Sequence, residues 1–301
     1  MSLKEEILKL KKEKNALIVA HLYQCDEIQE IADIVGDSYF LSKKAMESDK
    51  DLIIFCGVKF MAESAKILSP HKKVLIPSNE TTCPMADMAL VDRLENLMDK
   101  HPNAKVVSYI NSNLDIKALS DVCVTSSSAI DILNNLDTEE IIFLPDRNLV
   151  SYLQEQLPNK NFTLYQGFCP THERIEKEEI IELKKEYPDY LILVHPECNK
   201  DVRDLADFIG STSELINYSA SSSSNGFIVV TEEGVLYEMK LKSPTKTFIT
   251  TKTGMICPNM KKISLNDLYN CLKNEEFEVH IDEELRVKAH KALENMHLLS
   301  V

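Results

Sequence analysis

The residue pattern indicates an α/β protein built from three similar α/β/α units, each with a parallel sheet, arranged about a pseudo-threefold axis. Cys-Pro dipeptides at Cys83, Cys169 and Cys257 recur at intervals of 86 and 88 residues. Each dipeptide follows an apolar run that is typical of a buried strand, and such runs alternate with helix-like stretches along the chain. A nearly constant period of this length predicts one structural unit copied three times.

Composition limits the location and the partners of the protein. The 301 residues are 44% hydrophobic, which is enough for one large core or several small ones. A formal net charge of −14 disfavours binding to nucleic acid or anionic membranes, because both need clustered Lys and Arg. No apolar run is long enough to cross a membrane. The charged start of the chain does not resemble a signal peptide, so the eight cysteines predict a reducing, cytoplasmic location.

The first strand of each unit is predicted to end in polar side chains. These strands cover residues 16–24, 104–112 and 190–198. The polar residues at their ends are His21, Tyr23, Tyr109, Asn111, His195 and Glu197. Because ligands of open α/β sheets bind beyond the carboxyl ends of the strands, we expect these six side chains to face one site.

A set of turns with hydroxyl side chains follows these strands. Ser38, Ser126 and Thr212 are separated by 88 and 86 residues. Taken singly, each is an ordinary candidate for a helix N-cap. Taken as a threefold set, hydroxyls at helix N-termini predict a place for carboxylates or a phosphate.

The remaining elements complete each unit. Further strands are predicted over residues 51–57, 140–146 and 226–234, and opening helices near 3–13, 91–100 and 177–186. Two closing helices are predicted near 264–273 and 282–298. We expect unit boundaries at 1–87, 88–172 and 173–261, with the helices of 262–301 packed on the first unit.

The three Cys-Pro cysteines form the candidate metal site. Equivalent loops converge at a pseudo-threefold axis, so three thiolates are expected to meet at one point. This set suits a [4Fe-4S] cluster with one open iron better than it suits a zinc ion with an open position. The other cysteines are interpreted as small buried apolar residues: Cys25, Cys56, Cys123, Cys198 and Cys271.

Seven motifs stand out along the chain: HxYQ at 21–24, FCGVKFMAE at 55–63, YxN at 109–111, TS at 125–126, CPTH at 169–172, HPEC at 195–198 and GST at 210–212. Together with the spacing of the cysteines, they resemble the quinolinate synthase A family over nearly the whole chain. The resemblance implies an enzyme of de novo NAD biosynthesis that condenses iminoaspartate with dihydroxyacetone phosphate to give quinolinate, phosphate and water. It also implies three α/β/α units and an oxygen-sensitive [4Fe-4S] cluster.

The resemblance also implies roles for single residues. Cys83, Cys169 and Cys257 would hold the cluster, and Tyr23 and Glu197 would transfer protons, with Tyr109 and His195 as further catalytic residues. The substrate-binding residues that it implies are His21, Ser38, Tyr109, Ile110, Asn111, Ser126, His195, Pro196, Glu197 and Thr212. Leu22 and Ser128 depart from the family pattern, which often has Asn at both positions. An aspartate oxidase or aspartate dehydrogenase would supply the imine.

Three alternatives of other kinds stay open at the level of the sequence. A different [4Fe-4S] hydro-lyase would use the same open iron on another small hydroxy acid. An iron–sulfur sensor would need no strand-end residues, and a zinc protein would use the same three cysteines. Product analysis and metal analysis of protein purified without oxygen separate these alternatives.

Overall fold

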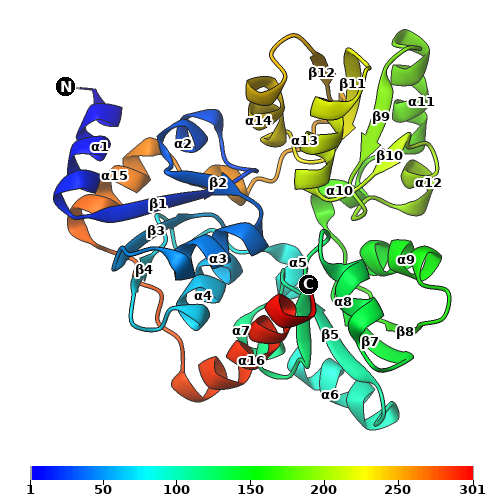
Figure 1. Ribbon diagram of the computed structural model, residues 1–301, viewed down its shortest axis with the longest axis horizontal. Helices are drawn as coiled ribbons and strands as arrows, with labels where there is room; N and C mark the ends of the chain where they lie inside the picture. The colour runs from blue at the N-terminus through cyan, green and yellow to red at the C-terminus, as the bar shows by residue number, and fades with distance from the viewer. Residues whose placement is uncertain (1, 301) are drawn as a thin grey trace.

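The computed structural model describes residues 2–300 and contains three four-stranded sheets in which all strands are parallel (Figure 1). The strand orders are β2-β1-β3-β4, β6-β5-β7-β8 and β10-β9-β11-β12. The three orders are the same when each unit is counted from its own first strand. The predicted α/β fold with three similar units is therefore confirmed.

Each unit follows the same order of helices and strands. The first contains α1 (Leu3–Glu13), β1 (Ala16–His21), α2 (Asp26–Ile31), β2 (Ile34–Gly36), α3 (Ser38–Glu47), β3 (Leu52–Cys56), α4 (Lys59–Leu68), β4 (Lys73–Leu75) and α5 (Pro84–Asp87). The second contains α6 (Val91–Lys100), β5 (Lys105–Tyr109), α7 (Leu114–Ala118), β6 (Val122–Val124), α8 (Ala129–Asn135), β7 (Glu140–Leu144), α9 (Arg147–Gln156), β8 (Asn161–Leu164) and α10 (Pro170–Glu173).

The third unit repeats this order and is followed by the closing helices. It contains α11 (Lys177–Glu186), β9 (Leu191–Val194), α12 (Lys200–Arg203), β10 (Phe208–Ile209), α13 (Thr212–Ser221), β11 (Gly226–Val230), α14 (Val235–Lys242) and β12 (Thr247–Ile249). The chain then forms the short 3₁₀ helix η1 (Met260–Lys262), α15 (Leu265–Asn274) and α16 (Glu283–Leu299).

The first strand of each unit is an inner strand of its sheet. All six residues of β1 are buried, and β1 pairs with β2 on one side and β3 on the other. The equivalent strands β5 and β9 have the same two kinds of neighbour. Because crossover helices cover both faces of a parallel sheet, these strands are mostly apolar and buried, apart from Lys105 at the start of β5 and the polar residues at the strand ends. Their polar ends therefore lie at the middle of one sheet edge.

Apolar clusters lie on both faces of each sheet. One large cluster joins the first and second units and includes Phe55 and Phe143. The third unit has two clusters of its own, and one of them takes Leu22 from the first unit. The first two units are therefore joined by a common core, whereas the third meets the first through a smaller apolar contact.

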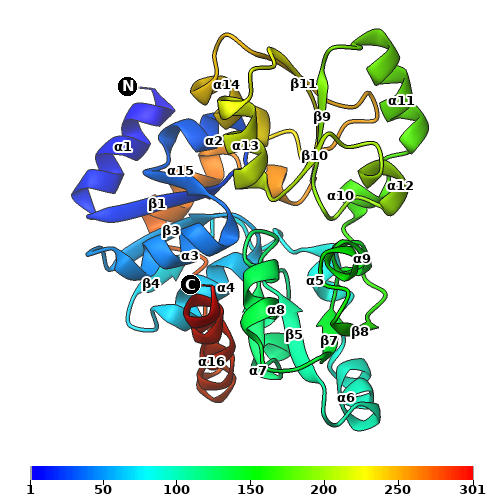
Figure 2. The ribbon, with the colours of Figure 1, turned by 45° about the vertical axis from the view of Figure 1, so that its right-hand side comes forward.

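The two closing helices take different positions. Helix α15 packs against α1 and buries Leu268 and Leu272 beside the first sheet. Helix α16 contacts α4 of the first unit and also α7, α8 and β6 of the second, as Figures 1 and 2 both show. Helix α16 thus bridges two units instead of covering the first alone. Within residues 2–300, no helix combines the length and the apolar character that crossing a membrane requires.

Candidate active site

One pocket lies where the carboxyl ends of the three sheets meet, and residues of all three units line it. Figure 1 shows α5 and α10, which start directly after Cys83 and Cys169, near the point where the units meet. The residues named from the sequence that line the pocket are His21, Tyr23, Ser38, Cys83, Tyr109, Ile110, Asn111, Ser126, Cys169, His195, Glu197, Thr212 and Cys257. Pro196 is buried nearby but does not line the pocket.

Glu197 is the carboxylate at the centre of the polar contacts in the pocket. Its Oε1 accepts a hydrogen bond of 2.6 Å from the Tyr109 hydroxyl, and its Oε2 lies 2.9 Å from His172 Nδ1. Burial alone would raise the pKa of Glu197, but His172, His195 and the Tyr109 hydrogen bond outweigh it and lower this pKa to about 2. Glu197 is therefore ionised at neutral pH.

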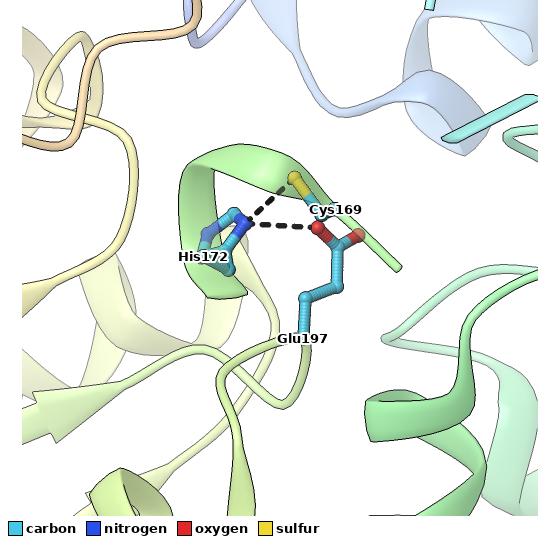
Figure 3. Close-up of side chains that lie close together, drawn as sticks. All are labelled: Cys169, His172 and Glu197. Carbon is cyan, nitrogen blue, oxygen red and sulfur yellow. Dashed lines mark hydrogen bonds and ion pairs between the residues drawn. The ribbon is translucent and has the colours of Figure 1, made fainter. Parts of the chain in front are cut away.

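One ring nitrogen of His172 faces both a cysteine, Cys169, and this carboxylate, as Figure 3 shows. The His172 Nδ1 atom is 3.2 Å from Cys169 Sγ, and Nε2 is 3.0 Å from the Thr231 hydroxyl. The Thr231 hydroxyl is in turn 3.1 Å from the Tyr23 hydroxyl, which also lies 3.1 Å from the Thr212 hydroxyl. A continuous path of polar contacts therefore connects Glu197 with Tyr23.

Tyr23 and Tyr109 are protonated phenols at neutral pH. Tyr109 is buried and Tyr23 is half-buried in the pocket, and removal from water raises the pKa of each hydroxyl well above its usual value, with the negative charge of Glu197 adding to the effect. Tyr109 donates its proton to Glu197, whereas Tyr23 faces two neutral hydroxyls. The two phenols therefore have different chemical surroundings in one pocket.

His21 and His195 are neutral donors. Burial lowers the pKa of each ring to about 3. The Nδ1 atom of His21 accepts a hydrogen bond from the backbone N–H of Tyr23, and that of His195 accepts one from the backbone N–H of Glu197. A neutral imidazole that accepts through Nδ1 carries its proton on Nε2. Each ring can thus offer one N–H to an anionic ligand.

The three predicted hydroxyls are not themselves the N-caps of their helices. Asp37 caps α3 and Ser211 caps α13 through side-chain hydrogen bonds, while Ser128 holds the N-cap position of α8. Ser38 and Thr212 are consequently the first residues of their helices and line the pocket, as does Ser126 in the turn before α8. The interpretation of Ser38, Ser126 and Thr212 as ordinary caps was wrong. Asp37 and Ser211 cap the first and third of these helices, and Ser128 holds the N-cap position of the second.

Comparison with known proteins identifies the family. The family model described as "Quinolinate synthetase A protein" matches residues 5–298. The chain belongs to the quinolinate synthase family. A quinolinate synthase of Clostridium perfringens is 58% identical over 299 residues, with 99% of each chain covered. Those of Clostridium acetobutylicum and Caldicellulosiruptor saccharolyticus are 56% and 50% identical over 299 and 298 residues, each match covering 99% of this chain and 98% of the relative.

Quinolinate synthases carry a [4Fe-4S] cluster, and the donor set of the pocket fits one. Each unit brings one thiol to the pocket, from Cys83, Cys169 and Cys257. Burial raises the pKa of all three thiols, that of Cys83 to about 12, so each stays protonated unless a metal replaces its proton. Among the residues that the structure describes, no fourth cysteine lines the pocket, and three soft sulfur donors favour an iron–sulfur cluster with an open iron.

The other five cysteines lie away from the pocket. Cys56 and Cys271 are buried in the apolar cluster between the first sheet and α15, and Cys25 packs against this cluster. Cys123 and Cys198 are buried in apolar clusters of the second and third units. All five therefore pack as small apolar side chains do, as the sequence predicted.

Two charged residues of the pocket region were missed in the sequence. Glu232 is fully buried and accepts hydrogen bonds from the backbone N–H of Cys257 at 3.1 Å and of Gly234 at 2.8 Å. Lys261 pairs with Glu232 at 3.1 Å and donates to the Tyr23 carbonyl at 2.8 Å. Glu232 thus holds the loop of the third cysteine, while Lys261 ties that loop to the first unit.

Proposed function

We propose that this protein is a quinolinate synthase, which condenses iminoaspartate with dihydroxyacetone phosphate to give quinolinate, phosphate and water in de novo NAD biosynthesis. The observation that carries the proposal is a single pocket with one cysteine from each unit beside an ionised Glu197 that is linked to the Tyr23 phenol. Membership of the quinolinate synthase family supports the same activity.

Cys83, Cys169 and Cys257 are the proposed cluster ligands. When bound, the cluster supplies a Lewis-acidic iron with an open coordination position. The hydroxyls of Ser38, Ser126 and Thr212 and the Nε2–H groups of the two neutral histidines are proposed to hold the carboxylates and the phosphate. Asn111, Ile110 and Pro196 complete the proposed substrate-binding set, although Pro196 can act only through the backbone beside the pocket.

Glu197 and Tyr23 are the proposed proton-transfer pair. At neutral pH Glu197 is ionised and Tyr23 is protonated, so the two groups are in the protonation states of a general base and a general acid. His172 and Thr231 join the two groups through an ion-pair contact and two hydrogen bonds, so a proton taken up at Glu197 has a path toward the Tyr23 hydroxyl. Tyr109 stabilises the carboxylate by donating to it, and His195 is placed beside it by the Glu197 backbone.

The chemistry of the cluster and of iminoaspartate supports two further proposals, on the cellular location of the protein and on the source of its substrate. A cytoplasmic location is proposed because a reducing compartment keeps the thiols and the oxygen-sensitive cluster intact. Since iminoaspartate is unstable, an aspartate oxidase or an aspartate dehydrogenase is the proposed source of this substrate.

The test is an anaerobic assay of the isolated protein with both substrates. Quinolinate identified by mass spectrometry, in protein with about four irons and four sulfides, is the expected result. Release of phosphate without quinolinate, or turnover of another hydroxy acid, would favour a different hydro-lyase. Zinc in place of iron, or a cluster without any turnover, would contradict the proposal.

A further inference from the structure

Three buried polar side chains recur at the interval of the structural repeat. They are Gln29 on α2, Lys117 on α7 and Arg203 on α12, and they are 88 and 86 residues apart. Each is at most 3% exposed. A buried polar side chain must find partners inside the protein, and these three find them in the same way.

Lys117 joins the second unit to the first. Its Nζ donates to the Ser112 carbonyl of its own unit at 2.6 Å and to the Phe60 carbonyl of α4 in the first unit at 3.4 Å. Ser112 directly follows Asn111, and both Asn111 and Phe60 line the pocket. One ammonium group therefore ties the strand end of one unit to a helix of its neighbour.

Arg203 makes the equivalent contact between the third unit and the second. Its guanidinium donates to the Cys198 carbonyl at 2.8 Å and to the Asn148 carbonyl of α9 at 3.1 Å. Cys198 directly follows Glu197. The Asn148 side chain also donates to the Glu197 carbonyl, at 3.1 Å.

Gln29 closes the ring between the first unit and the third. Its side-chain amide donates to the Gln24 carbonyl at 2.8 Å and to the Gly234 carbonyl at 2.9 Å. Gln24 directly follows Tyr23. A Cβ atom added at Gly234 would lie 2.8 Å from the Leu22 carbonyl oxygen and 2.9 Å from that of Gln24, so the two units touch closely at this point.

The residues whose carbonyls accept these hydrogen bonds recur at the same intervals as the three donor residues. Gln24, Ser112 and Cys198 are 88 and 86 residues apart, and so are the acceptors of the neighbouring units, Phe60, Asn148 and Gly234. We infer that Gln29, Lys117 and Arg203 are positioning residues, which form a ring of three inter-unit clasps that sets the strand ends carrying Tyr23, Asn111 and Glu197 around one pocket. This inference rests on the proposed function for its effect on turnover.

Lys160 provides a matched control within the same unit as Lys117. It is also buried, at 6% exposure, and its Nζ donates to the carbonyls of Leu136 and Thr138 at 2.9 and 2.7 Å. Both acceptors belong to the second unit and precede β7, so they lie at the sheet end opposite the pocket. Replacing Lys160 removes a buried ammonium with two carbonyl partners but leaves every inter-unit clasp in place.

The experiment compares Lys117→Met, Lys117→Arg and Lys160→Met as cluster-containing proteins. We expect K117M to lower kcat at least fivefold per folded, iron-loaded protein, because small displacements of reacting groups cost large factors in rate. K117R keeps the donor and should lose clearly less. K160M should keep kcat within twofold, whatever it costs in thermal stability. A smaller loss in K117M, an equal loss in K117R, or an equal loss in K160M would overturn the inference.

Two further measurements keep the test decisive if K117M folds poorly or the parent makes no quinolinate. Gly234→Ala should lower kcat at least fivefold by forcing the first and third units apart with Gln29 intact, and unchanged turnover would count against the ring.

Amide hydrogen exchange of residues 109–113 should speed up in K117M but not in K160M, whatever the reaction is. Equal exchange rates in both variants would overturn the inference that Lys117 forms an inter-unit clasp. If the parent protein is inactive but exchange is faster in K117M alone, only the proposed function is contradicted.

Discussion

Glu197 has to remain charged in a pocket where burial disfavours charge. Tyr109 and His172 each contact one of its carboxylate oxygens, and these contacts outweigh the effect of burial. A carboxylate that is already ionised can accept a proton from substrate without first losing one. The free-energy cost of burying this charge is therefore offset by contacts that exist in the folded protein before substrate binds.

Glu197→Gln is expected to abolish turnover while leaving the cluster in place. Glutamine keeps the size of the side chain but cannot accept a proton, so we expect kcat to fall by at least about 100-fold. Quinolinate formation and iron content should be measured on the same anaerobic samples. Glu186→Gln, which changes an exposed carboxylate of α11, is the control and should keep full activity. Normal quinolinate formation by E197Q would remove Glu197 from the reaction.

Thr231→Val tests the path between His172 and Tyr23. Valine has nearly the shape of threonine but lacks the hydroxyl that both neighbours contact. We expect kcat to fall about 10-fold, with little change in KM, because one lost hydrogen bond costs about 1 kcal/mol and tenfold in rate corresponds to about 1.4 kcal/mol. Thr231→Ser keeps the hydroxyl and should stay close to the parent. Equal kinetics in T231V and T231S would show that this hydroxyl carries no proton.

The sequence repeat predicts where a site residue lies in the fold better than it predicts which side chains that residue contacts. The strand ends at His21, Tyr109 and His195 could be found because three equal intervals point to one sheet edge. His172 was within a quoted motif, three residues after Cys169, but its contact with Thr231 joins the second and third units. Glu232 likewise meets Lys261 across a loop. Such contacts depend on how units pack, and no local pattern encodes them.

Each cysteine loop has a short helical element that fixes its thiol. Cys83 and Cys169 occupy the N-cap positions of α5 and α10, and the proline that follows each is the first helical residue. Proline suits this position because its missing N–H would have no partner in the helix and its φ angle is already helical. Cys257-Pro258 also precedes a short helix, η1, but there Asn259 holds the N-cap position and Met260 is the first helical residue. In the first two units the Cys-Pro pair therefore starts a helical turn and fixes the position of a proposed cluster ligand.

Cys257→Ala is expected to prevent stable cluster binding. Two thiols remain in the pocket, which is one too few for the three-cysteine arrangement, so iron and sulfide content should fall well below that of the parent. Cys271→Ala is the matched control, because Cys271 is buried in an apolar cluster away from the pocket. It should keep its iron and lose only about 1 kcal/mol of stability. Full iron content in C257A would exclude this residue as a ligand.

Element boundaries were predictable where apolar periodicity and turns agree. The opening helices α6 and α11 lie over residues 91–100 and 177–186, as the amphipathic pattern predicts. The helices after β2 and β10 were harder, because Asp37 and Ser211 compete with the neighbouring Ser38 and Thr212 for the N-cap position. Adjacent residues that can both cap leave the helix start uncertain by one position.

Helix α16 links two units through the largest apolar cluster of the molecule. Its buried residues, among them Leu293 and Met296, belong to the same cluster as Phe55 of the first sheet and Phe143 of the second. The sequence predicted this helix but not its neighbours, because an amphipathic face does not say which sheet it covers. The unit boundaries at 1–87, 88–172 and 173–261 stay a prediction.

Leu293→Ala is expected to destabilise the whole molecule without altering the chemistry of the pocket. Leu293 is fully buried, and truncation of a buried leucine costs about 3 kcal/mol in transfer and cavity free energy. Denaturant unfolding of the protein should report this loss, while kcat per folded protein should stay unchanged. Val287→Ala, on the exposed face of the same helix, should have almost no effect. A similar cost for both would show that α16 does not contribute to the core.

Positions 23, 111 and 197 are equivalent in the three units, yet they carry a phenol, an amide and a carboxylate. The backbone around the pocket is thus nearly symmetric, while the groups that it presents are all different. A reactant with distinct ends meets a different functional group in each of the three directions. The three related orientations of such a reactant are therefore not equivalent, and a nearly symmetric scaffold can still favour one of them.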